Sequence, residues 1–280
     1  MNRPEVIYKE FSVRKKSGRR YIQAPSEELK EFQFSLIPLL KQWEYHPRCA
    51  GLDERSIAFN ASFHKGKQNV LKMDLHSAFT STKERTIRRA IAKSNMPDQW
   101  KGQVFNLMPW LLFGSKRRYL PTGAPTSPFL LSIALTELDY WITDLLGPNY
   151  EFSRYADDIT ISTDEDISWE EKKSLIGAIS EKFLERGFSF SYSKTRWYEK
   201  GKSSSIIVTG VNVNVGGLIP RKFKLKFRAE LDHHARMSDE LDSYLQGKMD
   251  YIRSVSDDEF NYFTEYFTKR VSKYSRGTAT

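Results

Sequence analysis

Two adjacent carboxylates, Asp157 and Asp158, stand between two strand-like runs in the segment RYADDITIS. Residues 151–155 lead into the pair, and the β-branched run 159–162, with isoleucines at alternate positions, leads out of it. This pattern predicts a β-hairpin with the acids at its tip. Two like charges on a tight turn repel each other, so a bound cation is one reason for them, and hard carboxylate oxygens suit Mg²⁺. A polar hairpin turn without a ligand is the alternative.

The composition describes a soluble, folded chain with an anionic partner. Of its 280 residues 39% are hydrophobic, enough for one large domain or two or three small ones. A net charge of +9 with 14% aromatic residues suits a nucleic acid whose bases can stack. No apolar run of about 20 residues, basic amphipathic helix or signal region favours a membrane or secretion. The single Cys49 excludes an intrachain disulfide and a multi-cysteine zinc site, so we expect a cytoplasmic protein.

The order of predicted elements is that of an α+β fold with a helical appendage. Ser26 is a predicted helix cap, and the prolines and glycine of 120–128 exclude regular structure there. The predicted elements are strands within 11–25, a helix from Ser26, a strand-like stretch within 56–74, helices at about 82–94, 129–146 and 168–186, strands within 188–199 and 204–214, and a basic helical tail from about 216.

A third carboxylate, Asp74, ends the apolar run 69–73, where the chain turns toward a helix. An acid at this position costs burial energy unless a cation or a donor satisfies it, and a helix N-cap is the alternative. With Asp157 and Asp158 it supplies the ligands for two-metal phosphoryl transfer, in which the ions lie about 3.5–4 Å apart. Carboxylates on rigid strands suit that chemistry, because the protein's task is positioning and charge neutralisation.

Four segments in order, VLKMDLHSAF, LPTGAPTSP, RYADDITIS and FSYSKTRW, resemble the palm motifs of reverse transcriptases. KKSGRRYIQAP, upstream, is similar to the fingers motif of the bacterial enzymes. Asn60–His64 (NASFH, for NAxxH) and Val208–Gly210 (VTG) resemble elements of the retron branch, and YLQGKMDYIRSVSDDEF resembles its thumb. The similarity runs from about residue 8 to about residue 270. It implies a right-hand polymerase fold, with fingers and an antiparallel palm sheet over 1–215 and a short basic helical thumb over 216–280.

The resemblance implies roles for matching residues. Asp74, Asp157 and Asp158 match the catalytic metal-binding aspartates, with the Leu75 carbonyl completing the shell of one of two Mg²⁺ ions, for which Mn²⁺ can substitute. Phe79 matches the aromatic gate that crowds a ribose 2′-OH and favours dNTPs; ordinary core packing is its alternative. The other implied nucleotide contacts are Lys15, Lys16, Arg20, Thr122, Gly123 and Lys194.

Single residues among these contacts have simpler interpretations. KKSGRR by itself is typical of a solvated basic turn, and Lys194 of a surface lysine. In the family, Arg20 matches a forked donor to triphosphate oxygens, and Lys194 a proton donor or charge partner for pyrophosphate. Thr122 departs from the family pattern, since many relatives carry Gln there. Its shorter side chain without an amide predicts altered nucleotide affinity or fidelity rather than loss of activity.

The retron-like elements add a predicted RNA interface. His64 could be a packed core histidine, a phosphate contact or part of an RNA-recognition element, and the resemblance favours the last. Phe260, Phe263 and Phe267 lie at helical spacing and indicate a thumb core, with base stacking as the alternative. Cations alternate with apolar residues over 222–228, which gives one basic face if extended and a basic collar if helical. The predicted RNA contacts are Asn60, His64, Thr209, Gly210, Lys222, Lys224, Lys226 and Arg228.

The resemblance therefore implies an RNA-directed DNA polymerase that binds a cognate structured non-coding RNA. For the retron type it implies priming from the 2′-OH of an internal guanosine, a branched RNA–DNA product, and antiphage defence. A separately encoded effector and a host RNase H are expected partners, because the chain has no room for either. The alternatives are a group II intron-like or abortive-infection reverse transcriptase and an inactive RNA-binding scaffold. A group II intron type would usually carry extra maturase or nuclease segments, which this chain lacks, and an abortive-infection type should lack the NAxxH and VTG elements. Three intact aspartates disfavour the scaffold.

Overall fold

The centre of the molecule is a five-stranded sheet with the order β3-β5-β6-β4-β7. The computed structural model describes residues 3–15, 18–52, 55–115, 117–203, 205–214 and 218–276. Neighbouring strands are antiparallel except β3 and β5, which run parallel. The strands are β3 (Cys49–Ala50), β4 (Asn69–Asp74), β5 (Tyr150–Tyr155), β6 (Asp158–Thr163) and β7 (Arg196–Glu199). The hairpin predicted around Asp157 and Asp158 is confirmed as β5 and β6.

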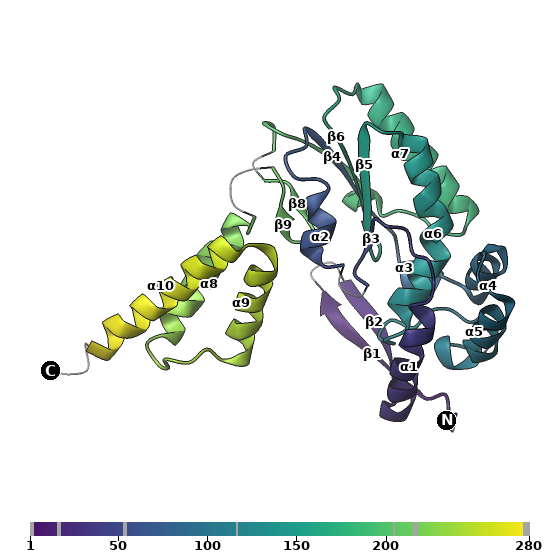
Figure 1. Cartoon of the computed structure of the whole chain (residues 1–280), viewed down its shortest axis with the longest axis horizontal. Helices are drawn as coiled ribbons and strands as arrows, with labels where there is room; N and C mark the ends of the chain where they lie inside the picture. The colour runs from purple at the N-terminus through teal and green to yellow at the C-terminus, as the bar shows by residue number, and fades with distance from the viewer. Residues whose placement is uncertain are drawn as a thin grey trace.

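The two faces of this sheet have different surroundings (Figure 1). Apolar side chains of β4, β5 and β6, Leu71 among them, pack in the main hydrophobic core with α6 (Ser127–Leu146) and α7 (Trp169–Glu185). Because side chains alternate along a strand, Asp74 and Asp158 project from the opposite face. The alternation of apolar and polar residues thus places the acids on the side away from α6 and α7.

A two-stranded hairpin and several helices form the N-terminal side of the molecule. β1 (Tyr8–Lys15) pairs antiparallel with β2 (Gly18–Pro25). The Ser26 hydroxyl accepts a 3.4 Å hydrogen bond from the Leu29 amide, so the predicted cap is confirmed. The helices of this side are α1 (Glu27–Leu40), α2 (Ile57–Ser62), α3 (Ala78–Ser81), α4 (Glu84–Lys93) and α5 (Asp98–Leu111).

Three C-terminal helices build a second hydrophobic core, apart from the first. They are α8 (Arg221–His234), α9 (Ser243–Val255) and α10 (Asp257–Arg276), and in Figure 1 they lie to one side of the sheet. Phe263 and Phe267 are buried in this core, which confirms their predicted core role, and Phe260 packs against it partly buried. The predicted boundary between residues 215 and 216 stays a prediction, which the separate core supports.

Two segments differ from the sequence-based prediction. Within 56–74 the strand is confined to β4, and earlier residues form helix α2, which Ser56 caps through a 3.2 Å bond from the Phe59 amide. In 188–199 only β7 is a strand, and it is preceded by the 3₁₀ turn η1 (Tyr192–Lys194), which the Thr195 amide closes on the Tyr192 carbonyl at 3.3 Å. The strands predicted within 204–214 are confirmed as the short pair β8 (Ile207–Val208) and β9 (Val211–Asn212). Among the described helices, none combines the length and apolarity that crossing a bilayer requires.

Candidate active site

The three predicted aspartates meet at one edge of the sheet. β4 and β6 pair in a register that sets Asp74 directly opposite Asp158. Asp157 lies in the turn before β6, and its carbonyl accepts a 3.0 Å hydrogen bond from the Leu75 amide. Residues some 80 positions apart in the chain are therefore held together by backbone pairing, which is more rigid than a loop.

The turn that carries the acids has an unusual backbone. Tyr155 and Asp158 are paired across the hairpin, so Ala156 and Asp157 form a two-residue connection. Ala156 has φ +53°, in the left-handed region that residues other than Gly seldom adopt. Such a conformation persists only where surrounding contacts hold it, and it often marks a functional site.

The electrostatics of the cluster favour protonation. Burial is the largest cause that raises the pKa of Asp158 to about 6, followed by the charges of Asp157 and Asp74. Burial also raises the pKa of Asp157, against opposing effects of a backbone hydrogen bond, Lys194 and Arg20. Carboxylates that resist ionisation together gain strongly from a cation between them.

Lys194 neutralises one of the three acids directly. Its Nζ donates to both carboxylate oxygens of Asp74 at 2.8 Å. The lysine side chain is 59% exposed, whereas that of Asp74 is 17% exposed. A second lysine, Lys72, lies on β4, the strand that ends at Asp74. Its Nζ donates a hydrogen bond to the Ile207 carbonyl at 2.8 Å. Burial lowers the pKa of Lys72, while Asp158 and Asp74 oppose that effect. Lys72 is not among the residues predicted from the sequence, although a lysine inside the apolar run NVLKM is a detectable signal.

The donor set fits a hard divalent cation by its chemistry. All three side chains offer carboxylate oxygens, the ligands that Mg²⁺ and Mn²⁺ accept. Within the described ranges, no group of three His, Cys, Asp or Glu side chains is already arranged to hold an ion. In this arrangement the ammonium of Lys194 takes the position of a counter-ion at Asp74. A metal would have to compete with that lysine for the carboxylate.

The Pro- and Gly-containing segment, residues 120–128, packs against β2, the strand that carries Arg20. Gly123 has φ +132°, and a Cβ there would stand 3.0 Å from Ile22 Cγ2. The Gln23 amide donates to the Thr122 carbonyl at 3.1 Å, and the Thr122 amide donates to Gln23 Oε1 at 3.2 Å. Gln23 is buried and is not among the residues predicted for this site. The one feature of the sequence that points to it is a polar residue between apolar ones in a strand.

The remaining nucleotide-side residues differ in how well they are placed. Arg20 is exposed on β2, and its charge opposes the burial that raises the pKa of Asp157. Phe79 packs against the main core while staying partly exposed, which leaves both of its interpretations open. Lys16 and the side chain of Lys15 lie outside the described residues.

Two predicted RNA contacts are instead buried. His64 is fully buried, and its ring nitrogens lie 2.7 Å from the hydroxyls of Ser162 and Ser153. Burial, with nearby cations, lowers the pKa of His64 to about 3, so the ring is neutral at physiological pH. Asn60 is equally buried, and its Nδ2 donates to Thr209 Oγ1 at 3.4 Å. The expectation that His64 and Asn60 touch RNA is wrong for this arrangement, because neither offers surface to a partner.

The two retron-like elements contact each other. Thr209 has φ +46°. Its hydroxyl accepts a hydrogen bond from the Asn60 side-chain amide and donates one to the Ile57 carbonyl at 3.2 Å. Gly210 accepts a 2.9 Å bond at its carbonyl from the Tyr251 hydroxyl of α9. The turn of the hairpin β8–β9 is thus hydrogen-bonded both to α2 and to α9.

The four cations of α8 that were predicted to contact RNA differ in their surroundings. Lys222 and Lys226 are exposed. Lys224 forms a 2.7 Å ion pair with Glu259, and the Arg228 guanidinium lies 5.0 Å from the ring centroid of Tyr262. The helical form of the 222–228 pattern is confirmed. Lys226 lies 3.7 Å from Glu230 in an ion pair of the helix surface.

The family model for reverse transcriptase (RNA-dependent DNA polymerase) matches residues 13–213. The chain therefore belongs to the reverse transcriptase family. It is 29% identical over 276 residues to the retron Mx65 reverse transcriptase of Myxococcus xanthus, which covers 90% of this chain and 62% of that one. It is 27% identical over 296 residues to the retron Ec73 reverse transcriptase of Escherichia coli, with 98% and 89% covered. The retron Ec83 reverse transcriptase of Escherichia coli is 30% identical over 174 residues, with 59% and 55% covered. These matches confirm the predicted resemblance to retron reverse transcriptases. The chain spans only 62% and 55% of the Mx65 and Ec83 relatives.

Solved structures show the same fold. Telomerase from Candida albicans, in complex with a fragment of telomeric RNA, aligns with a TM-score of 0.57 at 15% identity, covering 96% of this chain and 55% of that one. Apo telomerase from Candida tropicalis aligns with a TM-score of 0.57 at 12% identity, covering 99% and 61%. The predicted right-hand α+β fold is confirmed. In that fold the five-stranded sheet is the palm, and the C-terminal helices are hereafter called the thumb.

Proposed function

We propose that this chain is a retron-type RNA-directed DNA polymerase, which copies part of a cognate structured RNA into single-stranded DNA. One observation carries the proposal: in a reverse transcriptase domain, strand register sets Asp74 opposite Asp158, beside Asp157. An inactive scaffold has no use for three converging acids near RNA, since burial, together with their mutual repulsion, raises the pKa of Asp158. Similarity to retron enzymes over most of the chain supports the retron type.

The proposed mechanism combines the acids at the edge of the sheet with a cation on β2. Asp74, Asp157 and Asp158, with the Leu75 carbonyl, would hold two Mg²⁺ or Mn²⁺ ions. When bound, such ions activate an attacking hydroxyl and neutralise triphosphate charge. Arg20, exposed on β2, would supply forked donors that suit the phosphate oxygens of a dNTP.

Lys194 has a role that follows from its present contact. Its Nζ is paired with the Asp74 carboxylate, and its side chain is 59% exposed, so it can turn toward another anion. Once another cation neutralises the Asp74 carboxylate, Lys194 can neutralise the negative charge of the departing pyrophosphate or donate a proton to it. Phe79, partly exposed on α3, would crowd the ribose 2′-OH.

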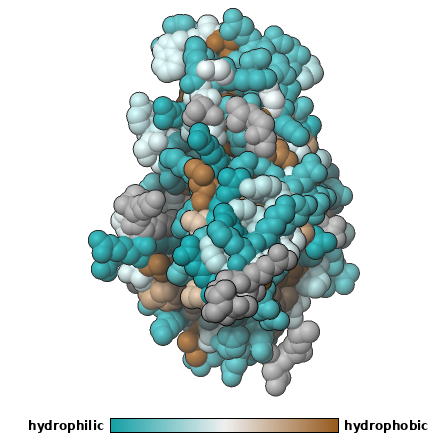
Figure 2. Space-filling model, turned by 90° about the vertical axis from the view of Figure 1, so that its left-hand side faces the viewer, coloured by the Kyte–Doolittle hydropathy of each residue, from teal (hydrophilic) through white to brown (hydrophobic). Residues whose placement is uncertain are grey.

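The finer retron features form part of the same proposal. Synthesis would begin from the 2′-OH of an internal guanosine and give a branched RNA–DNA product. Host RNase H would trim the template, and a separately encoded effector would link the complex to antiphage defence. The similarity to retron enzymes supports these features. The exposed Lys222 and Lys226 of α8 would supply cations for the RNA. Figure 2 shows a mainly hydrophilic surface on the side of the molecule where the C-terminal helices lie.

The test removes the paired carboxylates and follows both RNA and DNA. Asp157→Asn with Asp158→Asn should abolish DNA synthesis while leaving RNA affinity at the parental level. The matched control is Glu165→Gln with Asp166→Asn, an exposed acidic pair just after the far end of β6, which should polymerise like the parent. Continued synthesis by the Asp157/Asp158 variant would exclude the metal assignment.

The nucleic acid bound in cells tests the retron type separately. The protein is purified from cells with its bound nucleic acid, which is then treated with RNase. A short single-stranded DNA that keeps a branched nucleotide at its 5′ end is the expected product. Unbranched DNA would favour another bacterial reverse transcriptase, and unmodified RNA alone would favour the scaffold.

A further inference from the structure

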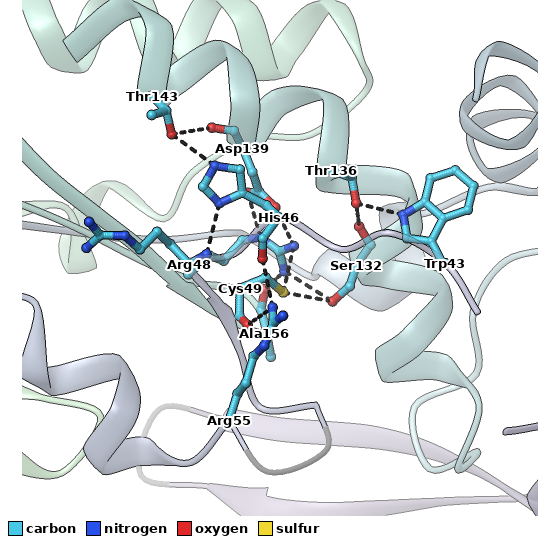
Figure 3. Close-up of polar contacts among 11 residues, drawn as sticks. Trp43, His46, Arg48, Cys49, Arg55, Ser132, Thr136, Asp139, Thr143 and Ala156 are labelled. Carbon is cyan, nitrogen blue, oxygen red and sulfur yellow. Dashed lines mark hydrogen bonds and ion pairs between the residues drawn. The ribbon is translucent and has the colours of Figure 1, made fainter. Parts of the chain in front are cut away.

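Arg154 lies beneath the catalytic turn and is fully buried. It sits on β5, and its guanidinium forms a fork with Asp139 of α6, with Nε to Oδ1 at 2.8 Å and Nη2 to Oδ2 at 2.7 Å. Nη1 donates to the Ala156 carbonyl at 2.8 Å. Figure 3 shows this network between α6 and the turn.

Every donor of the guanidinium has an acceptor. Besides these contacts, Nη1 lies 3.4 Å from Ser132 Oγ, and Nη2 lies 3.3 Å from Cys49 Sγ. A guanidinium carries five N–H donors, and the five hydrogen bonds of Arg154 use all of them. The group therefore has one orientation available to it.

A buried ion pair of this kind adds little to stability alone. Desolvation of both ions offsets their attraction, and well-packed apolar residues of similar size often serve as well or better. What Arg154 provides that an apolar residue cannot is the bond to the Ala156 carbonyl. That carbonyl belongs to the planar peptide leading into Asp157, so holding it orients the backbone that carries the acid.

The turn is held from a second side as well. Cys49 and Ala50 of β3 pair in parallel with Arg154 and Tyr155. Gly51 follows with φ +82°, and a Cβ there would stand 3.2 Å from the Tyr155 ring. The residues around the Arg154 contact therefore have little room to shift, and Ala156 keeps its left-handed φ of +53°.

We infer that Arg154, oriented by Asp139, is a positioning residue that holds the Asp157–Asp158 turn in the geometry needed to meet Asp74. This inference rests on the proposed function of the turn as the catalytic centre. Among the described residues, the hydrogen-bond partners of the Arg154 guanidinium include none of the three aspartates of the centre, so it acts through the Ala156 peptide.

The test uses the double variant Arg154→Met with Asp139→Leu, which removes both charges and leaves neither ion uncompensated. Arg154→Lys is the second variant: it keeps the charge, but a lysine cannot form the fork and the third contact together. The matched control is Lys172→Met with Glu199→Leu, an ion pair of 2.7 Å at the opposite end of the sheet from the aspartates.

Two measurements separate positioning from a merely structural role. The first is the Mg²⁺ concentration for half-maximal synthesis, together with kcat and KM for dNTP. The second is hydrogen exchange of the 155–158 amides without metal or RNA. In both Arg154 variants we expect about a tenfold lower kcat, a severalfold higher half-saturating Mg²⁺ concentration and faster amide exchange, at unchanged RNA affinity. The control should match the parent in all of these.

Parental Mg²⁺ dependence and parental exchange in a folded Arg154 variant would overturn the inference. A lower kcat that only follows a smaller folded fraction would do the same. Should the double variant not fold, Arg154→Lys decides by the same two measurements. The Asp157/Asp158 variant runs alongside: if it still polymerises, the proposed function fails, whereas its inactivity beside a parental Arg154 variant contradicts this inference alone.

Discussion

Replacing Asp158 by an asparagine should stabilise the metal-free protein at neutral pH. Burial, with the charges of Asp157 and Asp74, raises the pKa of Asp158 from 3.8 to about 6. A rise of this size corresponds to at most about 3 kcal/mol between the two protonation states. Because the folded protein holds this proton more tightly than the unfolded chain, the stabilisation is complete below about pH 4. It is lost as the pH rises through about 6.

The amide that replaces the carboxyl group cannot ionise, so the Asp158→Asn variant escapes this loss. At pH 4 the parent and the variant should unfold at similar temperatures. At pH 8 in EDTA the variant should gain up to about 3 kcal/mol, or about 6–12 °C in Tm for a chain of this size. Excess Mg²⁺ should then stabilise the parent and leave the variant unchanged.

Thermal unfolding followed by circular dichroism from pH 4 to 8.5 measures the difference. Asp166→Asn, which removes one acid from the exposed surface, should keep the parental pH profile. Equal Tm values of Asp158→Asn and parent at both ends of the range would refute the reasoning. So would a variant that is less stable than the parent at pH 8.

Two further substitutions test the parts around the centre. Gly123→Ala puts a Cβ 3.0 Å from Ile22 Cγ2 at φ +132°, so it should lower stability by about 1–3 kcal/mol and raise the KM for dNTP. Denaturant unfolding and steady-state kinetics measure these, and Gly102→Ala, with open space around its Cβ, is the control. His64→Ala leaves the hydroxyls of Ser153 and Ser162 without their partner and should cost about 2–4 kcal/mol, with unchanged RNA affinity per folded molecule. A drop in RNA affinity at unchanged Tm would instead return His64 to a direct contact.

The elements nearest the acids were predictable because their signals are local. Alternation in β5 and β6 and the turn between them predict a hairpin, and the apolar run of β4 predicts a strand that ends at Asp74. Short-range hydrogen bonds decide such elements, as at the Ser26 cap. The stretch before β4 was expected to be strand-like, and helix α2 replaces part of it because Ser56 caps its first turn there. Local patterns also could not show that only β7 of 188–199 would find a partner strand.

The sequence by itself determined the family of this chain and identified the three aspartates as candidate site residues. Both follow from short motifs and from strand periodicity, which are local patterns in the order of residues. It could not decide which side chains are buried or which charges pair. His64 is an internal bridge between two serines, and Lys194 meets Asp74 across 120 positions of chain. Arg154 is the first residue of the segment RYADDITIS, yet its guanidinium is fixed by α6 and β3. These outcomes depend on which face of a strand meets which helix, and packing in three dimensions alone decides that.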